Sequence, residues 1–160
     1  MDIFIIASGF VIRLFVGANA INVPPSHWII ITTFLLALFL ALAKRRDDVI
    51  LLERGIKARH NINGYNHTFL DIALSICASL VMVAYIFYSI DEAVNAHFNT
   101  HNLYITSVFV LLGIFRYMQI TFVKKDSSDP AKILLKDRFL QLTILAWVAS
   151  FVGIVVVAKI

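Results

Sequence analysis

The chain has 160 residues, of which 60% are hydrophobic and only 15% are charged, and its net charge is +4. Soluble domains average about 45–50% apolar and about 25% charged residues, so the composition excludes an ordinary soluble domain and predicts a membrane protein. The single cysteine, Cys77, excludes a disulfide framework and is expected to be an inert buried residue.

Five apolar segments follow one another along the chain, at residues 3–21, 28–43, 69–90, 103–123 and 139–158. A helix needs about 20 residues to cross a hydrocarbon core of about 30 Å, so each segment predicts a transmembrane helix. The second is slightly short, but Lys44 and Arg45 can extend it by snorkelling. The first contains Arg13 and has no basic leader, so a signal peptide is not expected. Without repeats or flexible linkers, residues 1–160 are expected to form one all-α membrane domain.

The connections between these segments alternate between basic and neutral. Residues 44–68 contain six Lys and Arg residues and residues 124–138 contain five, which together make eleven of the fourteen in the chain. The connections 22–27 and 91–102 contain none. The positive-inside rule therefore predicts cytoplasmic loops at 44–68 and 124–138, a cytoplasmic amino terminus and an external carboxyl terminus. This asymmetry accounts for the net positive charge without a nucleic-acid partner.

Two arginines, Arg13 and Arg116, lie inside apolar segments rather than in loops. By helix rise they sit roughly 16 Å and roughly 10 Å from the predicted cytoplasmic ends. A central arginine costs at least ~2.5–3.5 kcal/mol, so each should face protein, water or an anionic ligand. Two interpretations are open, a structural ion pair with an acidic residue such as Asp71 or a shared anion pocket. Asp71 could also simply stay hydrated at the membrane interface, and the presence of two such arginines favours the pocket.

The two predicted cytoplasmic loops mix carboxylates with cations, as in "KRRDD" at 44–48 and "KKDSSDPAKILLKDR" at 124–138. A simple tether for anionic lipid would be more uniformly basic. Carboxylates that hold a hard cation, beside cations that neutralise phosphate, suit a Mg²⁺–pyrophosphate ligand. Asp47 and Asp48 would point about 100° apart on a helix, so at most one is expected to face the site. The second loop also has a structural interpretation, in which Ser128 or Asp129 caps a short helix that starts at Pro130.

Four stretches resemble the carboxyl-terminal half of the UbiA prenyltransferase superfamily. They read "DIFIIASGFVIRLFVGA", "SHWIIITTFLLALFLALAKRRDDVILL", "GIFRYMQITFVKK" and "SDPAKILLKDRFLQLTILAWV". The resemblance is closest to the branch of the decaprenyl-phosphate phosphoribosyltransferases. It implies that the five helices are the fifth to ninth of a nine-helix bundle in the bacterial cytoplasmic membrane, with an active site open to the cytoplasm. Members carry an Asn-Asp-x-x-Asp motif for Mg²⁺ and diphosphate, and these 160 residues contain no such segment.

The resemblance also implies substrates and a site. The donor would be phosphoribosyl pyrophosphate, the acceptor a polyprenyl phosphate, and Mg²⁺ would be held mostly by the absent amino-terminal half. The expected phosphate ligands are Lys44, Arg45, Arg46, Arg13, Arg116 and Lys124. Asp47 or Asp48 would hold metal or a ribose hydroxyl, and the second loop would contribute Asp129, Lys136, Asp137 and Arg138. Alone, the chain is expected to be inactive, and its expected partners are membrane lipids and the missing half or another protomer.

Two other functions stay open. A related prenyltransferase would act on a different acceptor, but "KRRDD" occupies the place of a second aspartate-rich motif and argues against it. A non-catalytic membrane module that binds lipid would explain the missing motif. The intramembrane arginines and the mixed-charge loops argue against that module, because a scaffold has no need of them.

Overall fold

The computed structural model describes residues 2–53, 55, 65–123 and 130–159, and all regular structure within these ranges is helical. The long helices are α1 (Asp2–Ala20), α2 (His27–Glu53), α3 (His67–Ile90), α5 (Ser107–Phe122) and α7 (Arg138–Val157). The short elements are α4 (Glu92–Phe98), the 3₁₀ turn η1 (Leu103–Thr106) and α6 (Pro130–Lys136). Within the described ranges, five helical stretches are long and apolar enough to cross a membrane, which confirms the predicted fold class.

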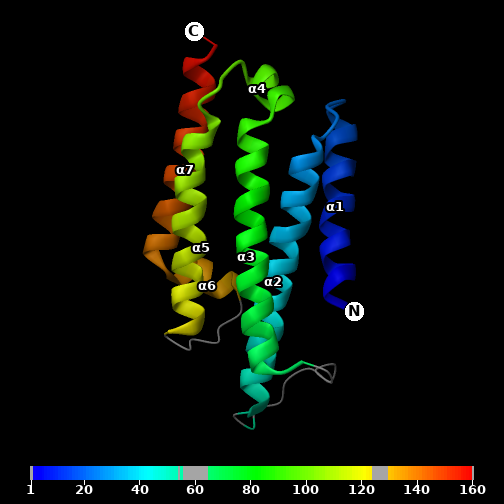
Figure 1. Ribbon diagram of the computed structural model, residues 1–160, viewed down its shortest axis with the longest axis vertical. Helices are drawn as coiled ribbons and strands as arrows, with labels where there is room; N and C mark the ends of the chain where they lie inside the picture. The colour runs from blue at the N-terminus through cyan, green and yellow to red at the C-terminus, as the bar shows by residue number, and fades with distance from the viewer. Residues whose placement is uncertain (1, 54, 56–64, 124–129, 160) are drawn as a thin grey trace.

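The helix α3 lies in the middle of the bundle, between the pair α1–α2 and the pair α5–α7 (Figure 1). It packs most extensively on α2, while α1 packs on the other side of α2. The core is concentrated toward the end of the bundle where α2 finishes, and includes Phe39, Leu70, Leu74 and Tyr117. Many large apolar side chains outside this core are exposed, for example Leu145 at 64%. Exposure of this kind suits contact with lipid, because acyl chains do not penalise apolar surface.

The helix α2 runs ten residues past the predicted membrane segment, through the charged stretch that the sequence analysis placed in a loop. No proline or glycine interrupts it, Arg45 pairs with Asp48 one turn on, and Val49 and Ile50 are buried. The apolar run therefore ends at Ala43, while the helix itself continues to Glu53. Gly55 follows with a φ of 74° and its N–H donates to the carbonyl of Leu52 at 2.9 Å, a conformation that favours glycine at a helix end.

Side-chain caps fix the starts of the later helices. Asn66 accepts from the N–H of Phe69 at 2.7 Å to start α3, and Asp137 accepts from the N–H of Leu140 at 2.9 Å to start α7. Pro130 is the first residue of α6, as its fixed φ favours. The predicted capping residues Ser128 and Asp129 lie outside the described residues.

Candidate functional site

The last turns of α2, together with the first turns of α1 and α3, form a cluster of charged side chains, which we call the charged end. It consists of Asp2, Lys44, Arg45, Arg46, Asp47, Asp48 and Asp71. Arg46 and Arg45 are only 3% and 9% exposed, whereas Lys44 is exposed. Arginines buried to this degree must be paired, so their partners determine what the charged end can do.

Arg46 joins three helices. Its Nε donates to Oδ1 of Asp71 on α3 at 2.5 Å, and its Nη1 donates to the carbonyl of Thr121 on α5 at 3.0 Å. Its guanidinium also lies 5.1 Å from the centre of the Phe122 ring, within the range of a cation–π contact. The second oxygen of Asp71 lies 3.1 Å from Nδ1 of His67. Arg46 therefore neutralises Asp71 and holds α2, α3 and α5 together.

Arg45 lies on the other side of α2 and joins it to α1. It forms an ion pair with Asp2, and its Nη1 donates to Oδ2 of Asp48 at 3.3 Å. The hydroxyl of Tyr65 lies 3.5 Å from the other oxygen of Asp2. Asp2 was not among the predicted site residues. Its position offered a signal, because it is an acidic residue in the first turn of a helix that starts on the side predicted to be basic.

The charged end is close to neutral overall. Three cations (Lys44, Arg45, Arg46) stand beside four carboxylates (Asp2, Asp47, Asp48, Asp71). A phosphate that bound here would therefore compete with carboxylates for Arg45, or would recruit further cations. Among the described residues, α6 packs against α2, buries Ile133 in the core and presents Lys136 to solvent, so it is one source of such cations.

Arg116 on α5 is engaged with the start of α7, apart from the charged end. Its Nη2 and Nε donate to the two oxygens of Asp137 at 2.7 and 3.2 Å, and its Nη1 donates to Gln119 at 2.8 Å. This bidentate geometry is the strongest form of an arginine–carboxylate pair. Of the two interpretations of Arg116, the structure contains the interhelical ion pair, with Asp137 as the partner rather than Asp71.

Beside this pair, an open groove of about 540 Å³ runs along α5 and α7. Its lining is Leu112, Phe115, Arg116, Gln119 and Phe139. The Arg116 guanidinium lies 5.6 Å from the centre of the Phe139 ring, so the aromatic ring covers one side of the ion pair.

Arg13 lies on the exposed side of α1, with its guanidinium 5.1 Å from the centre of the Phe10 ring. It makes no ion pair with any residue of the described ranges. Because α1 and α5 lie on opposite sides of α3 (Figure 1), the structure does not bring Arg13 and Arg116 into one pocket.

The second loop is described only from Pro130 onward. Lys136 and Arg138 are exposed, and Asp137 serves both as the cap of α7 and as the partner of Arg116. The predicted ligands Lys124 and Asp129 lie outside the described residues.

The residues present do not make a magnesium site by themselves. Nowhere in the described ranges do three His, Cys, Asp or Glu side chains come together as metal ligands. Asp48 accepts a hydrogen bond from Arg45. Asp47 is adjacent to Asp48 on α2, so the two carboxylates point in different directions and do not face each other as ligands of one metal ion. We therefore derive no chemical step from a metal bound to this part of the chain.

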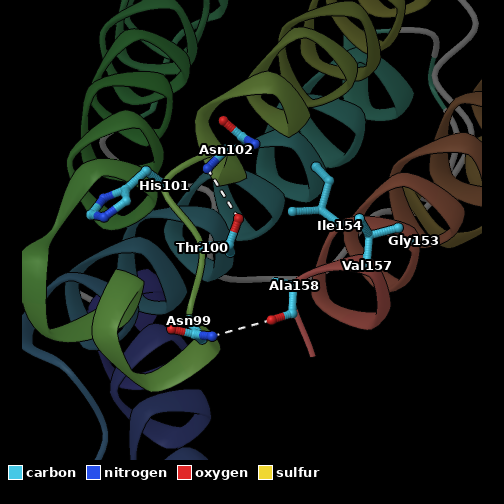
Figure 2. Close-up of a pocket in the computed structure, with 8 residues that line it drawn as sticks. All are labelled: Asn99, Thr100, His101, Asn102, Gly153, Ile154, Val157 and Ala158. Carbon is cyan, nitrogen blue, oxygen red and sulfur yellow. Dashed lines mark hydrogen bonds between the residues drawn. The ribbon is translucent and has the colours of Figure 1, made fainter. Parts of the chain in front are cut away.

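A second cavity, of about 530 Å³, lies at the opposite end of the bundle between the segment after α4 and the end of α7 (Figure 2). The side chain of Asn99 donates to the carbonyl of Ala158 at 3.1 Å, and the N–H of Asn102 donates to Thr100 at 3.2 Å. The first bond ties the connecting segment to the end of α7, and the second lies within the segment. No residue of the charged end lines this cavity.

Comparison with known proteins shows what the chain is similar to. No protein-family model matches the chain. The chain is 29% identical to the decaprenyl-phosphate phosphoribosyltransferase of Mycolicibacterium smegmatis over an alignment of 157 positions, which covers 94% of this chain and 49% of that protein. It is 29% identical to the protein of the same name from Corynebacterium glutamicum over 95% of this chain and 46% of the relative. The chain is a homologue of the decaprenyl-phosphate phosphoribosyltransferases.

This homology confirms the resemblance seen in the sequence motifs. The similarity runs along almost the whole chain, so it includes α2. The chain spans about half the length of the curated relatives it matches.

Proposed function

We propose that this chain is one part of a phosphoribosyltransferase that moves phosphoribose from phosphoribosyl pyrophosphate to a polyprenyl phosphate. The observation that carries the proposal is the homology, which covers 94% of the chain and matches relatives named for this transfer. Since those relatives are about twice as long, the proposal includes further membrane helices, in the same polypeptide or in another, that complete the site. By this proposal the chain is inactive alone.

In this proposal the charged end forms one wall of the phosphate site, on the cytoplasmic side of a bacterial membrane. An oxygen of the lipid phosphate attacks the ribose C1, and the bond from C1 to the pyrophosphate oxygen breaks, so that pyrophosphate leaves with the electron pair. Cations placed where this negative charge develops lower the barrier. Lys44 is exposed, and the buried Arg45 is held by the carboxylates of Asp2 and Asp48, so both are positioned to exchange partners with a phosphate.

Arg46 has a different task in the same proposal. Its guanidinium is committed to Asp71 and to the Thr121 carbonyl, so it positions the end of α2 against α3 and α5. Lys136 and Arg138, with Lys124, would add positive charge from the second loop, and Asp47 or Asp48 would face a ribose hydroxyl or a metal held mainly by the remaining helices. Arg116 and Asp137 would fix the position of that loop. The prenyl tail would stay in the bilayer beside the exposed apolar helices.

A chimeric enzyme tests this proposal. The matched segment of the M. smegmatis protein is replaced by this chain, and membranes are assayed with radiolabelled phosphoribosyl pyrophosphate and decaprenyl phosphate. We expect lipid-linked label with the chimera and none with this chain alone. Substituting Arg45→Gln in the chimera should reduce turnover by about 10²-fold, the usual effect of removing one group that stabilises developing charge.

The matched control is Lys159→Gln, an exposed cation at the other end of the bundle, which should leave turnover unchanged. Thermal unfolding of each chimera in detergent checks that the variants are folded. A folded Arg45→Gln chimera with normal turnover would refute the assignment of the charged end.

One observation favours a non-catalytic module that binds lipid. The buried arginines of the charged end already have internal partners, and the cluster is nearly neutral. The chimera distinguishes the two functions, because a folded chimera without transfer activity would support the module.

A further inference from the structure

The helix α1 presents an unusual stripe on its outer side, formed by Gly9, Arg13 and Gly17 at intervals of four residues. Residues at this spacing lie on one face of a helix. The residues that α1 buries are Ile3 and Ala7, whereas Arg13 and Gly17 are exposed and a Cβ at Gly9 or Gly17 would meet no atom within 4 Å. The stripe therefore belongs to the part of α1 that no described helix covers.

Arg13 is the least expected residue of this stripe. It is eleven positions from the start of α1 and seven from its end, so it lies near the middle of a span about 28 Å long by helix rise. It is exposed and has no ion-pair partner in the described part of the chain. An arginine at this depth costs at least ~2.5–3.5 kcal/mol unless a partner compensates for its charge.

The two glycines leave room for such a partner. A Cβ built at Gly9 or at Gly17 would meet no atom within 4 Å. Small residues spaced by four on a membrane helix allow a second backbone to approach closely. A charged group flanked by this space is accessible to a helix packed across the stripe.

The charge of Arg13 restricts what that helix can be. A second copy of this chain packed on the same face by a two-fold axis would place Arg13 beside Arg13, which is repulsive. Nor does another copy offer a free carboxylate at this depth: the one acidic residue within its apolar segments is Asp71, near the end of α3 and paired with Arg46.

We propose that the Gly9–Arg13–Gly17 face of α1 binds a different membrane-spanning helix, which carries a single Asp or Glu at the depth of Arg13. The carboxylate accepts from the guanidinium, and the two glycines let the helices approach until this contact forms. The inference rests on α1 alone and is independent of the transferase activity.

The test measures association of the full chain with designed helices in phosphatidylcholine vesicles. The chain carries Cys77→Ser and a donor dye on Lys159→Cys. The probes are Leu/Ala helices of about 23 residues with one central Asp, Asn or Leu and an acceptor dye. We expect energy transfer to saturate at several-fold lower probe density for the Asp helix than for the Asn and Leu helices. Equal association of the three helices would overturn the proposal and would mean that Arg13 reaches lipid headgroups instead.

Variants identify the face. Arg13→Leu should remove the preference for the Asp helix, and Arg13→Asp should transfer it to a helix with a central Lys. Gly17→Leu should weaken association several-fold. The matched control, Gly153→Leu on α7, adds the same side chain at another open glycine and should have no effect. If Arg13→Leu keeps the preference, the Asp helix binds elsewhere and the proposal is wrong.

Discussion

Arg46 shows how a residue that the sequence suggests for ligand binding acquires a structural task. In the sequence it is one of three adjacent cations, but in the structure it is 3% exposed and has partners on two other helices. These partners are 25 and 75 positions away along the chain. Neighbouring residues on a helix point in different directions, so Lys44, Arg45 and Arg46 have three different environments.

Replacing Arg46 should therefore destabilise the protein. Arg46→Met leaves Asp71 and the Thr121 carbonyl without their donor, which costs about 3–5 kcal/mol when the remaining charge is fully buried. Because the Asp71 side chain is 32% exposed, water compensates in part, and we expect a smaller loss than this range, about 2 kcal/mol. Denaturant unfolding in detergent measures the change.

Two variants complete this measurement. Adding Asp71→Asn to Arg46→Met should recover part of the loss, since the unpaired charge is removed. Lys44→Met, an exposed cation on the same turn, should change the free energy of unfolding by less than about 0.5 kcal/mol. Equal losses for Lys44→Met and Arg46→Met would contradict the structural role of Arg46.

At the scale of elements, helix pairs are joined by single polar contacts within an apolar bundle. The hydroxyl of Tyr85 on α3 accepts from Nε1 of Trp147 on α7 at 2.7 Å and pairs with the hydroxyl of Thr106 at 2.7 Å. Thr106 also donates to the carbonyl of Leu103, at 2.6 Å. This network joins α3, η1 and α7 near the end of the bundle that is opposite the charged end (Figure 1).

Tyr85→Phe should break this network without changing the packing volume. Interhelical hydrogen bonds in membrane proteins contribute about 0.6 kcal/mol on average and at most about 1.7. We expect a loss near the upper value, because two partners of Tyr85 are affected at once. The hydroxyl of the half-buried Tyr88 makes no hydrogen bond within the described part of the chain, so Tyr88→Phe is the matched control and should be neutral in the same unfolding experiment.

At the scale of the whole molecule, the described charged side chains of both signs are concentrated at one end of the bundle, and the other end carries fewer of them. The charged end gathers the ends of α1, α2 and α3, while α4 and the cavity near His101 lie at the opposite end (Figure 1). The positive-inside rule then predicts that the charged end faces the cytoplasm.

Cysteine labelling tests this orientation. In a Cys77→Ser background, Lys44→Cys and His101→Cys place single thiols at two exposed positions of opposite ends. In intact bacterial spheroplasts, a membrane-impermeant maleimide should label the thiol at position 101 and reach the thiol at position 44 only after permeabilisation. The reverse pattern would show that the bundle is inserted the other way round.

The membrane helices were predictable from the sequence because each depends on a local property, a run of apolar residues long enough to cross a bilayer. The predicted segments and the observed helices agree closely for α1, α3 and α7. The extent of α2 was less predictable, because hydropathy marks where the lipid ends and not where the helix ends. The capping role of Asp137 was also missed, since its pattern was interpreted as part of a ligand loop.

The sequence by itself determined the class of protein, the five apolar segments long enough to cross a membrane and the homology to the decaprenyl-phosphate phosphoribosyltransferases, all of which depend on composition and on motifs along the chain. Only the tertiary structure decided which charges meet. It pairs Arg46 with Asp71, Arg45 with Asp2 and Arg116 with Asp137, and it leaves Arg13 on an uncovered face of α1. The physical reason is that an ion pair requires contact within a few ångströms, and such contacts between helices depend on how each helix is rotated and packed against its neighbours.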